Sequence, residues 1–182
     1  MGRACELTLV VFMVPHAIRG TTITRMLAAV GIMLLWLAAP ATAAGDNAML
    51  GKWTIVRADP APWSDNANYP PDRKEAPGFV GKHVVFTAKQ IKGPSLLACA
   101  DPNYDMKDYT ADMLFQGELG EFEQRGGKKA EDTATAIGFK TRPIRTLETG
   151  CEGAIDFHMS DADHAAFALN NMIYWLARDK TK

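Results

Sequence analysis

Apolar and polar residues alternate over many short stretches of the chain, with a period of two residues. In the stretch WTIVR, Trp53, Ile55 and Arg57 fall on one face, whereas Thr54 and Val56 fall on the other. This pattern predicts a β strand, because successive side chains of a strand point to opposite faces and β-branched residues favour strands. We therefore expect the folded part of the chain to begin with a strand.

The last apolar stretch, HAAFALNNMIYWLARDK, predicts a β hairpin. Phe167 and Leu169 alternate with alanines before Asn170-Asn171, and a second apolar run follows. Asparagine tolerates the positive φ angles that a tight two-residue turn requires. In the second strand, Tyr174 and Trp175 fall on opposite faces, so one ring points into the core and the other points outward or lies under a loop.

The middle of the chain carries similar short apolar runs between turn signals. Strands are expected at residues 82–88 and 89–98, within 114–122, within 134–140 and within 145–160, and a turn followed by a single-turn helix is expected at 101–113. Turns spaced by roughly 8 to 12 residues are typical of β-sandwiches and barrels. The sequence therefore predicts a mostly β fold: a single antiparallel β-barrel or strongly curved sheet of about eight strands, with at most short helices.

One long segment, residues 59–81, interrupts this pattern. It contains five prolines and two glycines, which exclude a regular element. Loops of this length in a compact domain are usually functional or mobile. Its aromatic residues Trp63, Tyr69 and Phe79 are therefore candidates for binding a ligand or a partner; if they are packed instead, they fix the segment as a lid.

The N-terminal part of the chain predicts an export signal. Arg25 precedes the apolar run MLAAVGIMLLWLAAPATAA, and Ala41-Thr42-Ala43 provides the small residues that a signal peptidase accepts. We therefore divide the chain into an N-terminal extension with a signal peptide, residues 1–44, and a β-barrel-like domain, residues 45–182. Both Met1 and Met26 remain possible start codons.

An uncleaved membrane anchor is the alternative interpretation of the same apolar run. The 18 uncharged residues from Leu27 to Ala44 approach the lower length limit for crossing a bilayer. Pro40 and the alanine-rich end favour cleavage instead. We expect contact with a membrane only if the signal segment stays attached, and we expect the domain to be periplasmic or secreted in a bacterium.

Charge and cysteine content narrow the class of protein further. From Gly45 onward, 17 Lys and Arg residues stand against 20 Asp and Glu residues, a net charge of −3, and neither sign clusters. Nothing therefore favours a nucleic-acid partner. Cys5 lies in the removed part, which leaves Cys99 and Cys151 as an even pair. An oxidising compartment favours a disulfide between them.

The two ends of the domain resemble the lipocalins and the wider calycin family of barrels. The resemblance rests on Gly51-Lys52-Trp53 at the start of the first strand and on Arg178 at the end of the last. In those barrels a basic residue of the last strand packs across the indole of the first, which closes one end. The resemblance implies that Gly51, Trp53 and Arg178 have a structural role and that a ligand binds at the opposite, open end.

Four residues that are able to ligate a metal ion give one further hypothesis. His158, Asp161, Asp163 and His164 lie within seven residues, and histidine and carboxylate groups can ligate zinc. The sequence contains no G-x-S-x-G, phosphate-loop or H-E-x-x-H motif. We therefore name no catalytic residue and expect no cofactor, and an enzyme or metal-binding protein built on these four residues stays as the alternative.

The expected function is that of a non-catalytic binding module of the cell envelope. It would hold a small apolar ligand or a protein partner at the barrel mouth, because barrels with open ends form pockets there. Small exported β-barrels with one disulfide also look like the periplasmic lysozyme inhibitors, which present a loop to an enzyme cleft. That resemblance implies a protein partner instead of a small ligand.

Overall fold

The computed structural model describes residues 48–65 and 67–180. The expectations for the signal peptide, the N-terminal extension and Cys5 fall outside the described residues. No helix in the described ranges is long and apolar enough to cross a bilayer.

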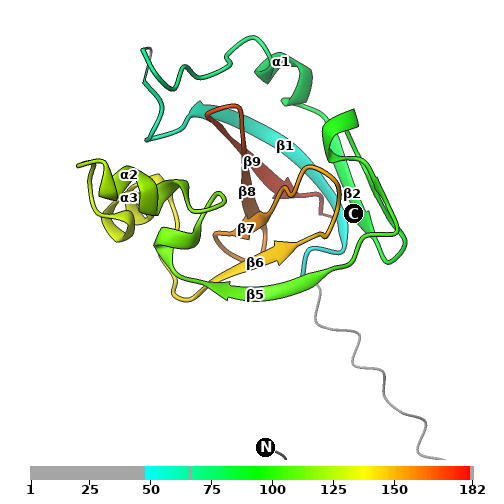
Figure 1. The fold of residues 1–182 in the computed structure, drawn as a ribbon. Helices are drawn as coiled ribbons and strands as arrows, with labels where there is room; N and C mark the ends of the chain where they lie inside the picture. The colour runs from blue at the N-terminus through cyan, green and yellow to red at the C-terminus, as the bar shows by residue number, and fades with distance from the viewer. Residues whose placement is uncertain (1–47, 66, 181–182) are drawn as a thin grey trace, which may run out of the picture. The chain divides into compact units, whose positions relative to one another are not determined.

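A single antiparallel sheet of nine strands forms the body of the domain and curls strongly on itself (Figure 1). The strands are β1 (Gly51–Pro60), β2 (His83–Thr87), β3 (Gln90–Lys92), β4 (Cys99–Ala100), β5 (Asp105–Tyr109), β6 (Ile144–Glu148), β7 (Phe157–Met159), β8 (His164–Leu169) and β9 (Met172–Arg178). Their order across the sheet is β4-β3-β2-β1-β9-β8-β7-β6-β5. The mostly β, strongly curved architecture is therefore confirmed, with slightly more strands than expected.

The first and last strands lie side by side. β1 pairs with β9 in a register that sets Trp53 opposite Arg178. The hairpin between β8 and β9 turns at Asn170 and Asn171, whose φ angles are 49° and 58°, as a tight turn of this kind requires. The expected hairpin is confirmed.

A β-bulge in β1 changes which face its second half presents. The pairing with β9 shifts register between Ile55 and Arg57, so Val56 is the extra residue. Arg57 consequently lies over the ring of Trp175, 4.9 Å from its centroid, on the face opposite the buried Trp53. The expectation that Arg57 shares a face with Trp53 and Ile55 was wrong, because the simple alternation did not include the bulge.

The inner face of the curled sheet is filled by the protein's own aromatic side chains. Phe86 of β2 packs edge-on against Phe157 of β7 at 4.9 Å, although three strands lie between them in the sheet. Phe167 continues the row, 5.5 Å from Phe157 and 5.0 Å from Tyr174. All four side chains are 2% exposed or less. The interior is thus a packed core.

A helical layer covers the outer face of strands β6 to β9. It consists of the 3-10 helix η2 (Ala111–Met113) and the helices α2 (Glu118–Gln124) and α3 (Ala130–Ile137). Its apolar residues Leu114, Leu119 and Phe139 are fully buried and pack in one cluster with Trp175. Trp175 thus lies under this layer, while Tyr174 points into the inner core.

Three element predictions for this region were wrong. Strands were expected within 114–122 and 134–140, but most of these residues form helices α2 and α3 instead. The turn and single-turn helix expected at 101–113 contain strand β5, with η2 at the end. Strand 89–98 is short, because β3 ends at Lys92 and η1 (Ser95–Leu97) follows.

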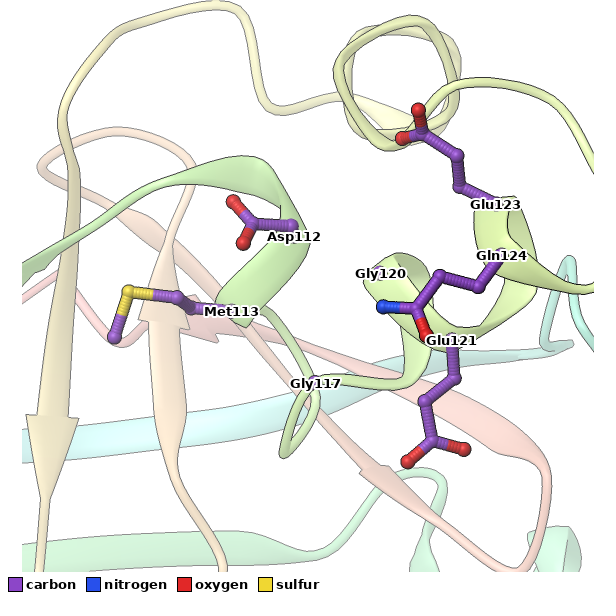
Figure 2. Close-up of a pocket in the computed structure, with 7 residues that line it drawn as sticks. All are labelled: Asp112, Met113, Gly117, Gly120, Glu121, Glu123 and Gln124. Atoms are coloured by element: carbon purple, nitrogen blue, oxygen red, sulfur yellow. The ribbon is translucent and has the colours of Figure 1, made fainter.

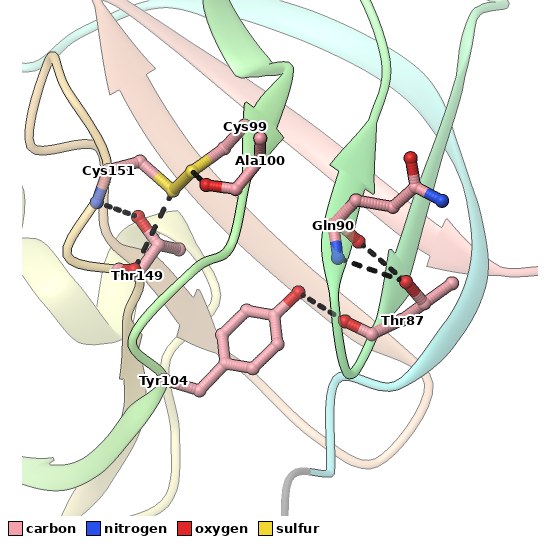
Figure 3. Close-up of a disulfide and its surroundings, with 7 residues drawn as sticks. All are labelled: Thr87, Gln90, Cys99, Ala100, Tyr104, Thr149 and Cys151. Atoms are coloured by element: carbon pink, nitrogen blue, oxygen red, sulfur yellow. Dashed lines mark hydrogen bonds between the residues drawn. A yellow bond between two sulfur atoms is a disulfide. The ribbon is translucent and has the colours of Figure 1, made fainter.

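The two edges of the curled sheet meet at one corner, which a disulfide fixes (Figure 3). Cys99 of β4 is bonded to Cys151 in the connection between β6 and β7, with 6.0 Å between their Cα atoms. Tyr104, just before β5, donates its hydroxyl hydrogen to the carbonyl oxygen of Thr87 at 3.0 Å. The disulfide and this hydrogen bond thus hold the two edges of the sheet close together.

Candidate functional site

Arg178 of the last strand packs across the indole of Trp53 in the first strand. The guanidinium carbon of Arg178 lies 4.1 Å from the centroid of the Trp53 ring. The same side chain donates to the carbonyl oxygens of Leu50, at 2.9 Å, and of Ala48. A Cβ atom at Gly51, whose φ is 120°, would lie 3.3 Å from Arg178 Nη1, so glycine leaves room for the guanidinium. Gly51, Trp53 and Arg178 therefore pack together where the first and last strands pair.

The long segment 61–79 covers the other end of the sheet. Two of its three predicted aromatic residues are packed: Trp63 is 4% exposed and Phe79, in the short helix α1 (Ala76–Phe79), is 5% exposed. Phe79 lies 5.0 Å from the ring of Tyr174. Tyr69 remains 38% exposed. Packed aromatics therefore fix this segment as a lid, and Tyr69 alone of the three is available at the surface.

Hydrogen bonds dock this lid onto the β8–β9 hairpin. Trp63 Nε1 donates to Asn171 Oδ1 at 3.1 Å, and Asn170 Nδ2 donates to Glu75 Oε2 at 3.0 Å. The backbone N–H of Asp72 donates to the carbonyl oxygen of Asn170 at 3.0 Å. The hairpin tip therefore fixes the lid at several points.

A groove of about 280 Å³ lies beside this hairpin tip, and we call it the mouth groove. It is lined by Trp63, Phe115, Gln116, Glu118, Ala168, Leu169, Asn170 and Asn171. The lid, the β8–β9 hairpin and the turn before α2 all contribute residues. The mouth groove thus brings together three segments far apart in the sequence.

Left-handed backbone is concentrated around the mouth groove. Of the six non-glycine residues with positive φ in the described ranges, four line it: Phe115, Gln116, Asn170 and Asn171. The hairpin accounts for the two asparagines. Phe115 and Gln116, with φ of 56° and 59°, are costly for their residue types. Such conformations persist only where surrounding contacts enforce them, and they cluster at functional sites.

A buried histidine enforces the conformation of Phe115. His158 is fully buried, and its Nε2 accepts a hydrogen bond from the Phe115 backbone N–H at 2.9 Å. This bond assigns the other ring hydrogen to Nδ1, which lies 2.9 Å from the hydroxyl oxygen of Thr146. Burial lowers the pKa of His158 to about 3, so the ring is neutral at pH 7. His158 is thus a positioning residue beneath the mouth groove.

The four residues of the predicted metal site do not come together. Both ring nitrogens of His158 are occupied under the helical layer, so neither is free to ligate. Asp161 and His164 form an exposed ion pair at 2.9 Å, and Asp163 contacts Arg178 at 3.8 Å. The described part of the chain contains no group of three or more His, Cys, Asp or Glu side chains arranged to hold a metal ion.

Carboxyl groups next to the mouth groove have perturbed acidity. Gln116 Nε2 donates to Asp156 Oδ2 at 3.4 Å and to the Ala154 carbonyl oxygen at 3.2 Å. Partial burial and then the charge of Glu148 raise the pKa of Asp156 to about 6. Partial burial also raises the pKa of Glu118. Both carboxyl groups therefore border the groove in environments that weaken their ionisation.

Glu118 has an unsatisfied oxygen. Its Oε2 atom is buried and has no hydrogen-bond partner among the described residues. Arg125 Nη2 lies 3.9 Å away, too far for a hydrogen bond, and the Arg125 guanidinium packs over the Tyr69 ring at 4.8 Å. A donor group on a bound molecule would satisfy this oxygen.

A second hollow, of about 660 Å³, lies between η2 and α2 and is acidic (Figure 2). Asp112, Glu121 and Glu123 line it together with Gln124 and Met113, which is 43% exposed. Gly120 permits η2 and α2 to approach closely, since a Cβ atom there would lie 3.0 Å from the Asp112 carbonyl oxygen. None of the non-glycine residues that line this hollow has a positive φ angle, in contrast to the mouth groove.

Of the three aromatic binding candidates expected from the sequence, only Trp63 lines the mouth groove. Phe115, Gln116 and Glu118 were not expected there, since the stretch LFQGELGEF was interpreted as a strand. Gly117, at the N-terminus of α2 with φ of 87°, was the available signal of a turn at this position.

Comparisons of the chain with models of protein families, with curated proteins and with solved structures found no match. What the structure shows of the class is a strongly curled antiparallel sheet of nine strands, in which Arg178 packs on Trp53.

Proposed function

We propose that this protein is an exported, non-catalytic binding module that recognises a protein partner through the mouth groove. The observation that carries the proposal is the enforced left-handed turn at Phe115 and Gln116, which a fully buried histidine holds at the groove. The export signal expected from the sequence and the disulfide support a periplasmic or secreted location.

The dimensions of the site favour a protein partner over a small apolar ligand. The inner face of the sheet is occupied by buried aromatic side chains, which leaves the calycin-like mode of enclosing a ligand without support. The mouth groove measures about 280 Å³. Pockets for drug-sized ligands are generally about 300–1,000 Å³ and mostly apolar. A shallow groove rimmed by amide and carboxyl groups suits an inserted side chain of a partner.

Recognition depends on groups that pair with donors of the partner. Glu118 accepts a hydrogen bond from an inserted amide or cationic side chain. Its Oε2 atom is one of three buried side-chain oxygens without a hydrogen-bond partner in the described part of the chain, and of these three residues only Glu118 lines the mouth groove. Tyr69 and Arg125, stacked beside the groove, extend the contact surface. Aromatic and arginine side chains are the residue types most enriched at interface hot spots.

The test compares Glu118→Gln with the matched control Asp132→Asn. Each change removes one negative charge from the first turn of a helix, α2 or α3, but only Glu118 lines the mouth groove. We expect the wild-type protein to form a one-to-one complex with a single envelope protein, measured by light scattering after cross-linking. Affinity should fall about tenfold in Glu118→Gln, a loss of about 1.4 kcal/mol, and stay unchanged in the control.

Two outcomes contradict the proposal. One is equal affinity of both variants for the partner. The other is saturable, stoichiometric binding of a fluorescent fatty acid that Glu118→Gln does not change, which would support a small apolar ligand instead.

A further inference from the structure

A third groove, on the outer face of strands β2 and β3, differs from the others in charge. It measures about 420 Å³ and is lined by Gly78, Lys82, His83, Val85, Lys92, Gly93 and Pro94. Val84 and Phe86 of β2 are buried in the inner core, so the alternate residues His83 and Val85 face outward. Lys92 of β3 pairs with Val85 and joins them on this face.

The groove carries positive charge that the described residues do not neutralise. None of its lining residues is acidic. Within the described ranges, neither Lys82 nor Lys92 has a carboxylate within ion-pair distance. Asp179 lies 3.6 Å from His83 Nδ1, and its carboxylate forms an ion pair with Lys52 at 3.0 Å. Two free ammonium groups in a domain of net negative charge form a local attraction for anions.

His83 is oriented so that it can also contribute to binding an anion. The Thr54 hydroxyl donates to Asp179 Oδ1 at 2.5 Å, so the Thr54 oxygen accepts from His83 Nδ1–H at 3.0 Å. This network assigns the neutral ring hydrogen to Nδ1. His83 Nε2 has no hydrogen-bond partner among the residues that the structure describes. It is therefore available to a ligand, as an acceptor when neutral and as a donor when protonated.

We propose that this groove binds a phosphate monoester, with Lys82, Lys92 and His83 holding the phosphate group and Val85 and Pro94 contacting its apolar substituent. Lysine ammonium groups pair with phosphate as compact point charges. His83 Nε2 forms a hydrogen bond with a phosphate oxygen. The phosphate belongs either to a soluble molecule or to a lipid head group, because both present the same group to the same three side chains.

The experiment titrates the protein by calorimetry with phenyl phosphate and with inorganic phosphate, and by sedimentation with vesicles of phosphatidic acid or of phosphatidylcholine alone. The variant is Lys82→Gln with Lys92→Gln. Its control is Lys128→Gln with Lys129→Gln, two exposed lysines between α2 and α3. Lys82→Arg with Lys92→Arg tests rescue by retained charge.

We expect saturable binding of phenyl phosphate, tighter than that of inorganic phosphate, that weakens about tenfold or more in the glutamine variant and survives in the arginine variant and in the control. Binding only to phosphatidic acid vesicles, with the same dependence on the two lysines, would assign the phosphate to a lipid. The absence of saturable binding to phenyl phosphate at about 10 mM and to phosphatidic acid would overturn the proposal. An equal weakening of binding in the Lys128→Gln, Lys129→Gln control would also overturn the proposal, since it would show non-specific attraction.

The mouth groove shares no lining residue with this site, so neither result bears on the partner proposed there.

Discussion

At the scale of single residues, Trp53 has the most demanding surroundings. Its side chain is fully buried, its Nε1 donates to the Met49 carbonyl oxygen at 2.7 Å, and Arg178 covers its ring. Burial, a hydrogen bond and a cation–π contact thus converge on one indole, at the end of the ladder that pairs the first and last strands.

Replacing Trp53 by alanine should lower the free energy of unfolding by about 3–5 kcal/mol, because a large buried side chain leaves a cavity. Urea denaturation of the purified protein measures this value. Trp53→Phe keeps a ring beneath Arg178 and should cost clearly less. A cost near zero for alanine would show that the indole does not stabilise the closed end.

His158 is a second residue whose role differs from its expected one. Its ring was a candidate metal ligand, but it holds the backbone of Phe115 instead. Replacing His158 by phenylalanine leaves the buried Phe115 N–H without a partner, which should cost about 1–3 kcal/mol. Urea denaturation measures the loss, with His83→Gln, a change at an exposed histidine, as the control. Equal stability of wild type and His158→Phe would contradict the positioning role.

At the scale of elements, the first strand and the last hairpin were predictable from the sequence, whereas strand β5 and the helical layer were not. Phe167 and Leu169 lie on one face of β8, and Tyr174 and Trp175 lie on opposite faces of β9, as a period of two residues predicts. Both strands are present. Helices α2 and α3 span only 7 and 8 residues, and tertiary packing on the sheet decides their structure more than local pattern does. The bulge at Val56 likewise left no signal in the alternation.

The same reason limited what was predictable about the site. Trp63 and Tyr69 were recognisable, because aromatic residues in a long proline-rich loop are conspicuous. Glu118 became relevant only once the turn at Phe115 placed α2 beside the hairpin tip, a contact between distant segments.

The disulfide is the element-scale feature with the clearest consequence. Cys99 and Cys151 are 52 residues apart and enclose β5, the helical layer and β6. Changing both cysteines to alanine should lower stability by about 2–5 kcal/mol, chiefly because the unfolded chain gains freedom. Thermal unfolding followed by circular dichroism measures the change, with the reduced wild-type protein alongside. Unchanged melting in both samples would show that the bond contributes nothing to stability.

At the scale of the whole molecule, the buried His158 and the half-buried Asp156 give stability an opposed dependence on pH. The pKa of His158 falls from 6.5 to about 3 on folding, so the unfolded state binds the extra proton between these values and stability is lost as pH falls from about 6.5. The pKa of Asp156 rises from 3.8 to about 6, so the folded state binds the extra proton and stability is lost as pH rises from about 4 to 6.

Single substitutions should separate these two contributions. Asp156→Asn removes the opposing effect and should make stability fall more steeply between pH 6 and 4, whereas His158→Phe should flatten the fall. The slope due to one group is at most about 1.4 kcal/mol per pH unit. Urea midpoints measured from pH 7 to 4 provide the comparison. Parallel curves for both variants and wild type would refute the assignment.

The pairing of β1 with β9 also governs when the molecule is able to fold. The hydrogen bond from Thr54 to Asp179 joins residues 125 positions apart. In a chain emerging from the ribosome, β1 can therefore pair with β2 early, but it lacks β9, its other neighbour, until almost all of the chain has been made. Such long-range pairing slows folding, because the loop must close before contacts stabilise it. A chain cut short before Met172 would expose the edge of β1 to other molecules and be prone to aggregate.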